Sequence, residues 1–199
     1  MPILKIINKW KLDEVKLLVN QLLISTPNVL DDPAFEKVVV YVCEHSADGA
    51  VGLIVNRPTE FNLQFVFEQL GINNPQADAS QQPVLFGGPV QQDRGFVIHR
   101  PFKNYHPNLD ITDDICVSTS KDILKKIANG EGPDDVLVTL GYAGWAANQL
   151  DEEIRNNTWL TCAANEELMY EVPFDLRWQY ALDSMGLDIT KLVLHSGNA

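Results

Sequence analysis

A run of six apolar residues, Val38-Val-Val-Tyr-Val-Cys43, constrains the fold more than any other segment of this chain. No polar residue interrupts it and four of its positions are β-branched, which is typical of a strand buried on both faces of a sheet. Residues 46–49 follow as a turn, and Val51-Gly-Leu-Ile-Val55 returns as a second strand. The two strands therefore predict a hairpin with a loop of about five residues.

Further strands and helices follow without strict β-α-β alternation. Strands are predicted at residues 22–25, 84–86, 95–99, 115–118, 135–140 and 158–162, and helices at 63–70, 121–128, 145–154 and 175–185, the last with Leu176, Tyr180 and Met185 facing inward. The polar segment from Gly71 to Pro83 is predicted to be a long mobile loop. Because hairpins are mixed with isolated helices, this order favours an α+β fold with a mixed sheet.

The composition is that of one ordinary globular domain. Apolar residues make up 45% of the 199 positions and charged residues 21%, and no linker or repeat divides the chain. The net charge is −12, so the average field of the protein would repel a phosphate backbone. No basic recognition helix accompanies a helix-turn-helix pattern. We therefore expect no direct binding to nucleic acid.

Cysteine usage and hydropathy indicate the compartment. Cys43, Cys116 and Cys162 form no Cys-x-x-Cys pair, which argues against a zinc ribbon or a thioredoxin-type site and fits a reducing environment. Charged residues interrupt the apolar positions at the start of the chain, so a signal peptide is not indicated. No apolar run reaches the length of about 18 residues that a membrane span needs. These features predict a cytoplasmic protein.

Several short motifs follow one another in a characteristic order. They are Cys43-Glu-His45, Gly49-Ala-Val-Gly-Leu-Ile-Val-Asn-Arg-Pro58, Phe86-Gly-Gly-Pro-Val90, Asp93-Arg-Gly-Phe-Val-Ile-His99, Ser118-Thr-Ser-Lys-Asp122, and Gly141-Tyr-Ala-Gly-Trp145 running into Gln149-Leu-Asp-Glu-Glu-Ile154. Each is weak alone, but together they resemble the AlgH/YqgE family of bacterial proteins. The chain departs from the family pattern at Asn148, where Gly is usual, and at Thr158, where Ser is common.

The resemblance implies an α+β fold in which a mixed, branched β-sheet forms a partial barrel flanked by helices. It implies no established enzyme activity. The family carries a label as a transcriptional regulator, linked in some bacteria to alginate control, without a demonstrated DNA-binding mode. Residues 18–199 would form the single family domain, and residues 1–17 an N-terminal extension. Apolar spacing over residues 4–18 predicts a short amphipathic helix there, and its mixed charge favours packing on the domain or on a partner subunit over a membrane surface.

The segment Gly141-Tyr-Ala-Gly-Trp145 is predicted to turn the strand at 135–140 into a helix that begins at Trp145. Glycine permits positive φ in such a turn, and the free N–H groups of the new helix would suit a small anion. The segment lacks the GxGxxG pattern and the Lys and Ser/Thr of a P-loop. A structural turn, with Trp145 packed into the core, is therefore favoured over an anion site.

Cys43 and His45 stand two residues apart on the predicted central strand, so their side chains would share one face. A thiol beside an imidazole is the minimal pair of nucleophile and base, but a buried cysteine on a central strand is more often inert. His45 and His99 belong to no metal-binding spacing such as HExxH. We expect neither a metal nor a cofactor.

The polar residues that a fold least requires are Asn56, Arg57, Asp93 and Arg94, which lie next to predicted strands. Arg57 and Arg94 would be able to grip a carboxylate or phosphate bidentately. The alternative, which we favour, is an internal ion pair between Asp93 and Arg57 that locks two loops together.

Gln149 and Glu153 are four residues apart on a predicted helix and share a face, which with Trp145 would line one side of a binding surface. The candidate ligand or partner site comprises His45, Asn56, Arg57, Asp93, Arg94, His99, Gly141, Gly144, Trp145, Gln149 and Glu153. No catalytic constellation is complete, so the favoured function is a non-enzymatic regulatory or binding protein that acts through protein contacts or a small anionic ligand. The alternative is a hydrolase or transferase of phosphorylated or acyl substrates, which requires His45, His99, Arg57 and Arg94 to converge in one pocket.

Overall fold

The structure, a computed structural model, describes residues 18–26, 33–73 and 75–187. The extension at residues 1–17, and with it the helix expected at 4–18 except for Leu18, lies outside the described residues. No helix in the described part of the chain is long and apolar enough to cross a bilayer.

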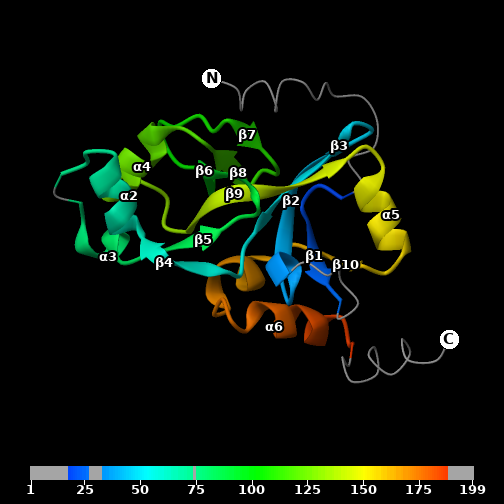
Figure 1. Cartoon of the computed structure of the whole chain (residues 1–199). Helices are drawn as coiled ribbons and strands as arrows, with labels where there is room; N and C mark the ends of the chain where they lie inside the picture. The colour runs from blue at the N-terminus through cyan, green and yellow to red at the C-terminus, as the bar shows by residue number, and fades with distance from the viewer. Residues whose placement is uncertain (1–17, 27–32, 74, 188–199) are drawn as a thin grey trace.

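Ten strands form one curled sheet, and helices flank it on several sides (Figure 1). The strands are β1 (Gln21–Ser25), β2 (Val39–Ser46), β3 (Gly49–Ile54), β4 (Pro58–Asn62), β5 (Pro83–Phe86), β6 (Val90–His99), β7 (Leu109–Asp110), β8 (Cys116–Ser118), β9 (Val136–Ala146) and β10 (Trp159–Ala163). Their order is β10-β1-β2-β3-β9-β6-β8-β7, with β4 and β5 as a branch. All pairs are antiparallel except β5 with β9, which is parallel. The predicted α+β fold with a mixed, branched, partly closed sheet is confirmed.

Strand β9 is the point at which the sheet branches. Its first half pairs with β5, its second half pairs with β3, and β6 pairs along most of its length. β2 and β3 form the predicted hairpin, in which Ser46 pairs with Gly49, so the loop is shorter than expected. β2 is buried along most of its length, as its apolar sequence predicts.

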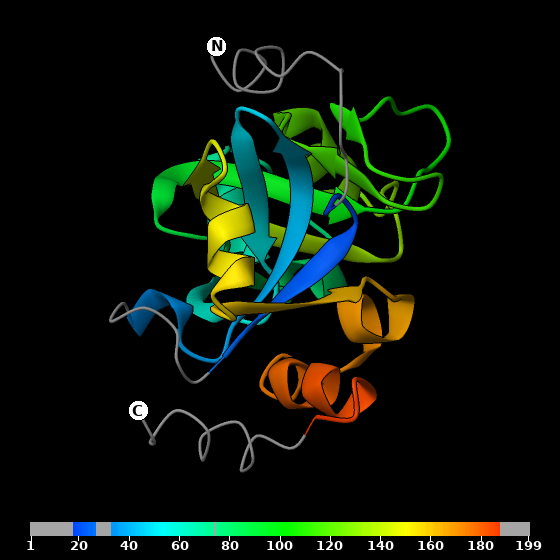
Figure 2. The same cartoon turned by 90° about the vertical axis from the view of Figure 1, so that its right-hand side faces the viewer.

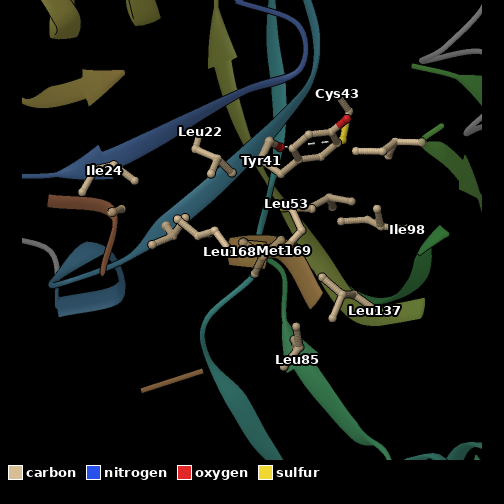
Figure 3. Packing of buried hydrophobic residues seen from close by; sticks show 14 of the residues in the cluster. Leu22, Ile24, Tyr41, Cys43, Leu53, Leu85, Ile98, Leu137, Leu168 and Met169 are labelled. Carbon is tan, nitrogen blue, oxygen red and sulfur yellow. Dashed lines mark hydrogen bonds between the residues drawn. The ribbon is translucent and has the colours of Figure 1, made fainter. Parts of the chain in front are cut away.

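Helices cover the sheet at three places (Figures 1 and 2). They are α2 (Leu63–Gln69), α3 (Ala77–Ser80), α4 (Lys121–Ala128), α5 (Gln149–Arg155) and α6 (Arg177–Ser184), with a 3-10 turn η1 (Pro33–Phe35) and a π-helical turn η2 (Glu167–Glu171). Three clusters of buried apolar side chains lie beneath them. In the largest, side chains from the sheet such as Tyr41, Leu53 and Ile98 meet Leu168 and Met169 of η2 (Figure 3).

The prediction for residues 141–154 was wrong in one important respect. β9 continues through Gly141 to Ala146, and α5 begins only at Gln149. Residues 141–146 alternate between buried and less buried positions, with Ala143 and Trp145 in the second apolar cluster, and this period of two is that of a strand. Asn148 adopts a left-handed conformation with φ of 64°, which asparagine tolerates.

Smaller corrections concern two other segments. The polar stretch predicted as a long mobile loop contains the short helix α3, whose Gln76 N-cap donates its backbone N–H to the carbonyl of Ala128. In α6 the buried residues are Arg177, Trp178, Ala181 and Leu182, whereas Leu176 is 53% exposed. Tyr180 and Met185 are partly buried and pack against the largest apolar cluster as predicted, so the helix was predicted correctly and only Leu176 was wrongly placed inward.

Candidate functional site

The Gly-Gly-Pro motif after β5 crosses directly over the glycine-containing middle of β9. β5 pairs with one edge of β9 and β6 with the other, so residues 87–89 must pass over the face of β9 to join them. A Cβ atom on Gly88 would lie 2.1 Å from the carbonyl carbon of Tyr142, and one on Gly141 would lie 2.3 Å from the carbonyl oxygen of Gly88. Gly141 also has φ of 73°. The two most recognisable motifs therefore serve a backbone crossing and not an anion-binding loop.

Trp145, Gln149 and Glu153 lie close together, but their polar groups form hydrogen bonds mainly with one another and are not left open to a ligand. One carboxylate oxygen of Glu153, Oε2, accepts hydrogen bonds at 2.8 Å from the indole N–H groups of both Trp145 and Trp159. The other oxygen accepts a bond of 2.8 Å from Gln149 Nε2, and Gln149 Oε1 accepts the backbone N–H of Ala146. This network fastens α5 to β9 and β10, so its polar atoms already have partners.

We expect Glu153→Gln to lower the free energy of unfolding by about 2 kcal/mol, because an amide offers one acceptor oxygen where the carboxylate offers two charged ones. Urea denaturation followed by tryptophan fluorescence measures the loss. The exposed neighbour Glu152→Gln is the control and should be neutral. Equal stability of both variants would contradict the role assigned to Glu153.

Cys43 and His45 do not share a face, contrary to the two-residue spacing. A β-bulge shifts the register of β2 against β3 between Val42 and Glu44. Cys43 consequently packs in the largest apolar cluster, whereas His45 lies opposite Ala50 of the second cluster, with its Nε2 3.3 Å from Asp151 Oδ2 on α5. Burial raises the pKa of the Cys43 thiol far above its usual range. The bulge therefore removes the geometry of a thiol–imidazole pair.

His99 is fully buried and held on both sides. Its Nδ1 lies 2.7 Å from the carbonyl oxygen of Arg100, which only accepts, so Nδ1 is the donor. Its Nε2 then accepts the hydroxyl of Ser118 at 2.8 Å. Burial lowers the pKa of His99, which favours this neutral form. Phe102 and Tyr105 also pack against the imidazole ring, so the contacts of His99 are those of a side chain that supports the fold.

His45 and His99 lie at opposite ends of β9. His99 pairs with Val136 at its beginning, and His45 pairs with Ala50, which pairs with Trp145 near its end. At about 3.3 Å per residue along a strand, the separation is too large for one pocket. The convergence of His45, His99, Arg57 and Arg94 that the enzyme hypothesis requires is therefore absent. Among the described residues no three His, Cys, Asp or Glu side chains gather as a metal site.

Asp93 and Arg94 lie in the bulged part of β6, where Asp93 is exposed. Arg94 is half-buried, and its Nη1 is a buried atom with no hydrogen-bond partner in the described part of the protein. Arg57 does not pair with Asp93 as expected. Its Nη2 donates instead to the carbonyl oxygens of Pro33 at 3.0 Å and Glu36 at 2.7 Å, which anchors the η1 turn.

Asn56 and Arg57 line an open depression with a volume of about 720 Å³. Its other lining residues are Pro58, Phe86, Pro173, Phe174 and Asp175. Asn56 is buried and fixes this corner, since its Oδ1 accepts the N–H of Val39 and its Nδ2 donates to the carbonyl of Lys37. The depression thus combines one arginine, one carboxylate and four apolar side chains. It is the candidate binding cleft.

Sequence reasoning found one wall of this cleft and missed the other. Pro173, Phe174 and Asp175 lie more than 100 residues from Arg57 in sequence, between η2 and α6. No motif marks them, whereas the other lining residues, Asn56, Arg57, Pro58 and Phe86, all stand within motifs of the sequence.

Comparisons with known proteins identify the family. The family model described as AlgH-like matches residues 22–190. A UPF0301 protein of Legionella pneumophila (strain Lens) is 50% identical over 185 residues, which is 93% of this chain and 98% of that protein. A UPF0301 protein of Thioalkalivibrio sulfidiphilus is 44% identical over 180 residues, 90% of this chain and 96% of its own length. The chain belongs to the AlgH-like family.

Solved structures agree with this assignment. The solution structure of the AlgH protein from Pseudomonas aeruginosa superposes with a TM-score of 0.75 at 39% identity, covering 96% of this chain and 100% of that one. A protein from Corynebacterium diphtheriae has a TM-score of 0.65 at 17% identity, covering 90% of this chain and 92% of its own, and shows the shared fold alone.

Proposed function

We propose that this protein is a non-enzymatic binding protein, and that the cleft beside Arg57 takes a ligand in which a carboxylate adjoins a flat apolar group. The recognising chemistry is the same whether the carboxylate belongs to a free small molecule or to a side chain of a partner protein. The observation that carries the proposal is the anchoring of Arg57 at the wall of an otherwise apolar depression. The free cysteines and the acidic charge support a cytoplasmic setting.

Arg57 is suited to hold an anion because its orientation is already fixed. One amino group, Nη2, is occupied by two backbone carbonyls, so the guanidinium loses little further freedom on binding. Its remaining N–H groups can donate to a carboxylate. Phe86, Pro58, Pro173 and Phe174 offer apolar contact, and a volume of this order suits a ligand of drug-like size.

Asp175 on the opposite wall makes the cleft selective. No ion pair joins it to Arg57 within the described residues, so the two charges face the cleft separately. A second negative charge on the ligand would be repelled by Asp175. The cleft therefore favours a single carboxylate over a phosphate dianion.

A titration with N-acetyl-L-phenylalanine as the probe, followed by backbone amide NMR shifts, tests the proposal. We expect shifts around the cleft, and binding at least about tenfold weaker for the uncharged amide of the probe and for Arg57→Gln, which both lose a charged hydrogen bond. Arg155→Gln, an exposed arginine on α5, is the matched control and should bind normally.

Asp175→Asn provides a second variant that leaves the anchoring of η1 intact. Removing its charge should tighten binding of the probe several-fold at low salt and lessen the difference between carboxylate and phenyl phosphate. Equal affinity of acid and amide, or unchanged affinity in both cleft variants, would refute a carboxylate site.

A further inference from the structure

A second, smaller cleft of about 200 Å³ lies where η2 and the start of α6 meet β5 and the beginning of β9. It is lined by Gln82, Pro83, Asp134, Asp135, Val136, Leu137, Tyr170, Phe174 and Arg177. Phe174 also lines the larger cleft, so the two clefts adjoin at this residue. Two of the lining groups are buried and lack the partners that such groups normally have.

Arg177 is the first of these groups. It is only 1% exposed, its Nε donates to the carbonyl of Val172 at 2.9 Å, and its Nη1 donates to the carbonyl of Val55 at 2.6 Å. The ring of Phe174 lies 4.3 Å from the guanidinium carbon. No carboxylate in the described part of the chain lies within ion-pair distance, and burial lowers the pKa of Arg177 to about 10. A buried guanidinium without a counter-ion is unfavourable, and a bound anion would relieve this.

Tyr170 is the second group. Its hydroxyl oxygen is buried and has no hydrogen-bond partner in the described residues. A buried hydroxyl of this kind is costly to leave unpaired. Tyr170 and Arg177 line the same cleft, so a ligand bound there has both donors on its wall.

The mouth of the cleft is acidic, in contrast to the hydrogen-bond donors in its interior. Asp134 is exposed there, and Asp135 is paired with Arg100, whose Nε lies 2.7 Å from Asp135 Oδ2. Arg100 is also paired with Glu166 at 2.7 Å, so the carboxylates around the mouth outnumber the cation. A donor-rich interior behind an acidic mouth repels multiply charged anions and attracts a ligand that carries both signs.

We propose that this cleft is a binding site for a small zwitterionic carboxylate of the amino-acid type. The carboxylate lies inward toward Arg177 and Tyr170, and the ammonium group lies outward toward Asp134. The site is separate from the Arg57 cleft and does not depend on the function proposed for it.

Glycine, acetate, methylamine and phosphate, each titrated into the full chain and followed by amide NMR shifts, test the proposal. Glycine should shift amides near Tyr170 and Arg177 and bind several-fold more tightly than acetate, whereas methylamine and phosphate should not bind there. Arg57→Gln should leave glycine binding unchanged, which distinguishes this site from the larger cleft.

Tyr170→Phe is the decisive variant, because Arg177 also supports the fold through two backbone bonds. It should weaken glycine binding at least fivefold while leaving the melting temperature of the free protein unchanged or higher, since it removes an unpaired hydroxyl. Tyr105→Phe is the control: its hydroxyl is bonded to Ser120 Oγ at 2.9 Å, so its loss should lower the melting temperature and leave glycine affinity alone. No binding of glycine at 100 mM, equal binding by Tyr170→Phe, or equally tight binding of phosphate would overturn the proposal.

Discussion

Gly141→Ala is expected to lower the free energy of unfolding by about 2–5 kcal/mol, a large fraction of the stability of an ordinary protein. An alanine at φ of 73° costs about 1–2 kcal/mol by itself. Its Cβ would also lie 2.3 Å from the carbonyl oxygen of Gly88 and 3.0 Å from that of Val90, and forcing these backbones apart adds about 1–3 kcal/mol. Urea denaturation, or the yield of soluble protein if the variant does not fold, measures the effect.

Gly144→Ala, three residues along the same motif, is the matched control. Its added Cβ would meet only the ring of Tyr142, at 3.2 Å, and a ring on an incompletely buried side chain can move. Within a strand alanine is also preferred to glycine, so the change should be within about 1 kcal/mol of wild type in either direction. If the two variants were equally destabilised, the crossing of residues 87–89 over β9 would not be the reason for the glycines.

Glu44→Gln is expected to raise the free energy of unfolding by about 2 kcal/mol at pH 8 and to change it little at pH 4. Burial raises the pKa of Glu44 to about 7, and its Oε2 has no partner among the described residues. Below the unfolded pKa of about 4.5 the carboxyl is protonated in both states and has no ionisation penalty. As the pH rises from there to about 7 the unfolded state ionises first, so wild-type stability falls across that window.

Urea denaturation of both proteins at several values between pH 4 and 8 measures this difference. Glu60→Gln, an exposed carboxylate on β4, is the control and should follow the wild-type curve. A stability difference between Glu44→Gln and wild type that does not vary with pH would contradict a raised pKa at this position.

The sequence alone determined those elements whose pattern has a local physical cause. Val38 to Cys43 is a buried strand because six consecutive apolar, mostly β-branched residues suit no other position in a sheet. The helix at 121–128 was found with its observed bounds, because Ser120 and Asp122 mark its start and apolar spacing defines its buried face. The motif order also identified the family, and with it the branched, partly closed sheet.

Only the tertiary structure decided why residue 141 must be glycine and which element the side chain of His45 faces. A positive-φ glycine within a strand is indistinguishable in sequence from a turn, because the reason for it is another segment, residues 87–89, passing over its face. The bulge at Cys43 turns His45 toward α5, and a one-residue shift of this kind leaves no mark on the spacing of side chains in the sequence. The clefts beside Arg57 and Arg177 join walls from distant parts of the chain. Local residue patterns fix what a segment becomes, whereas long-range packing fixes which side chains meet.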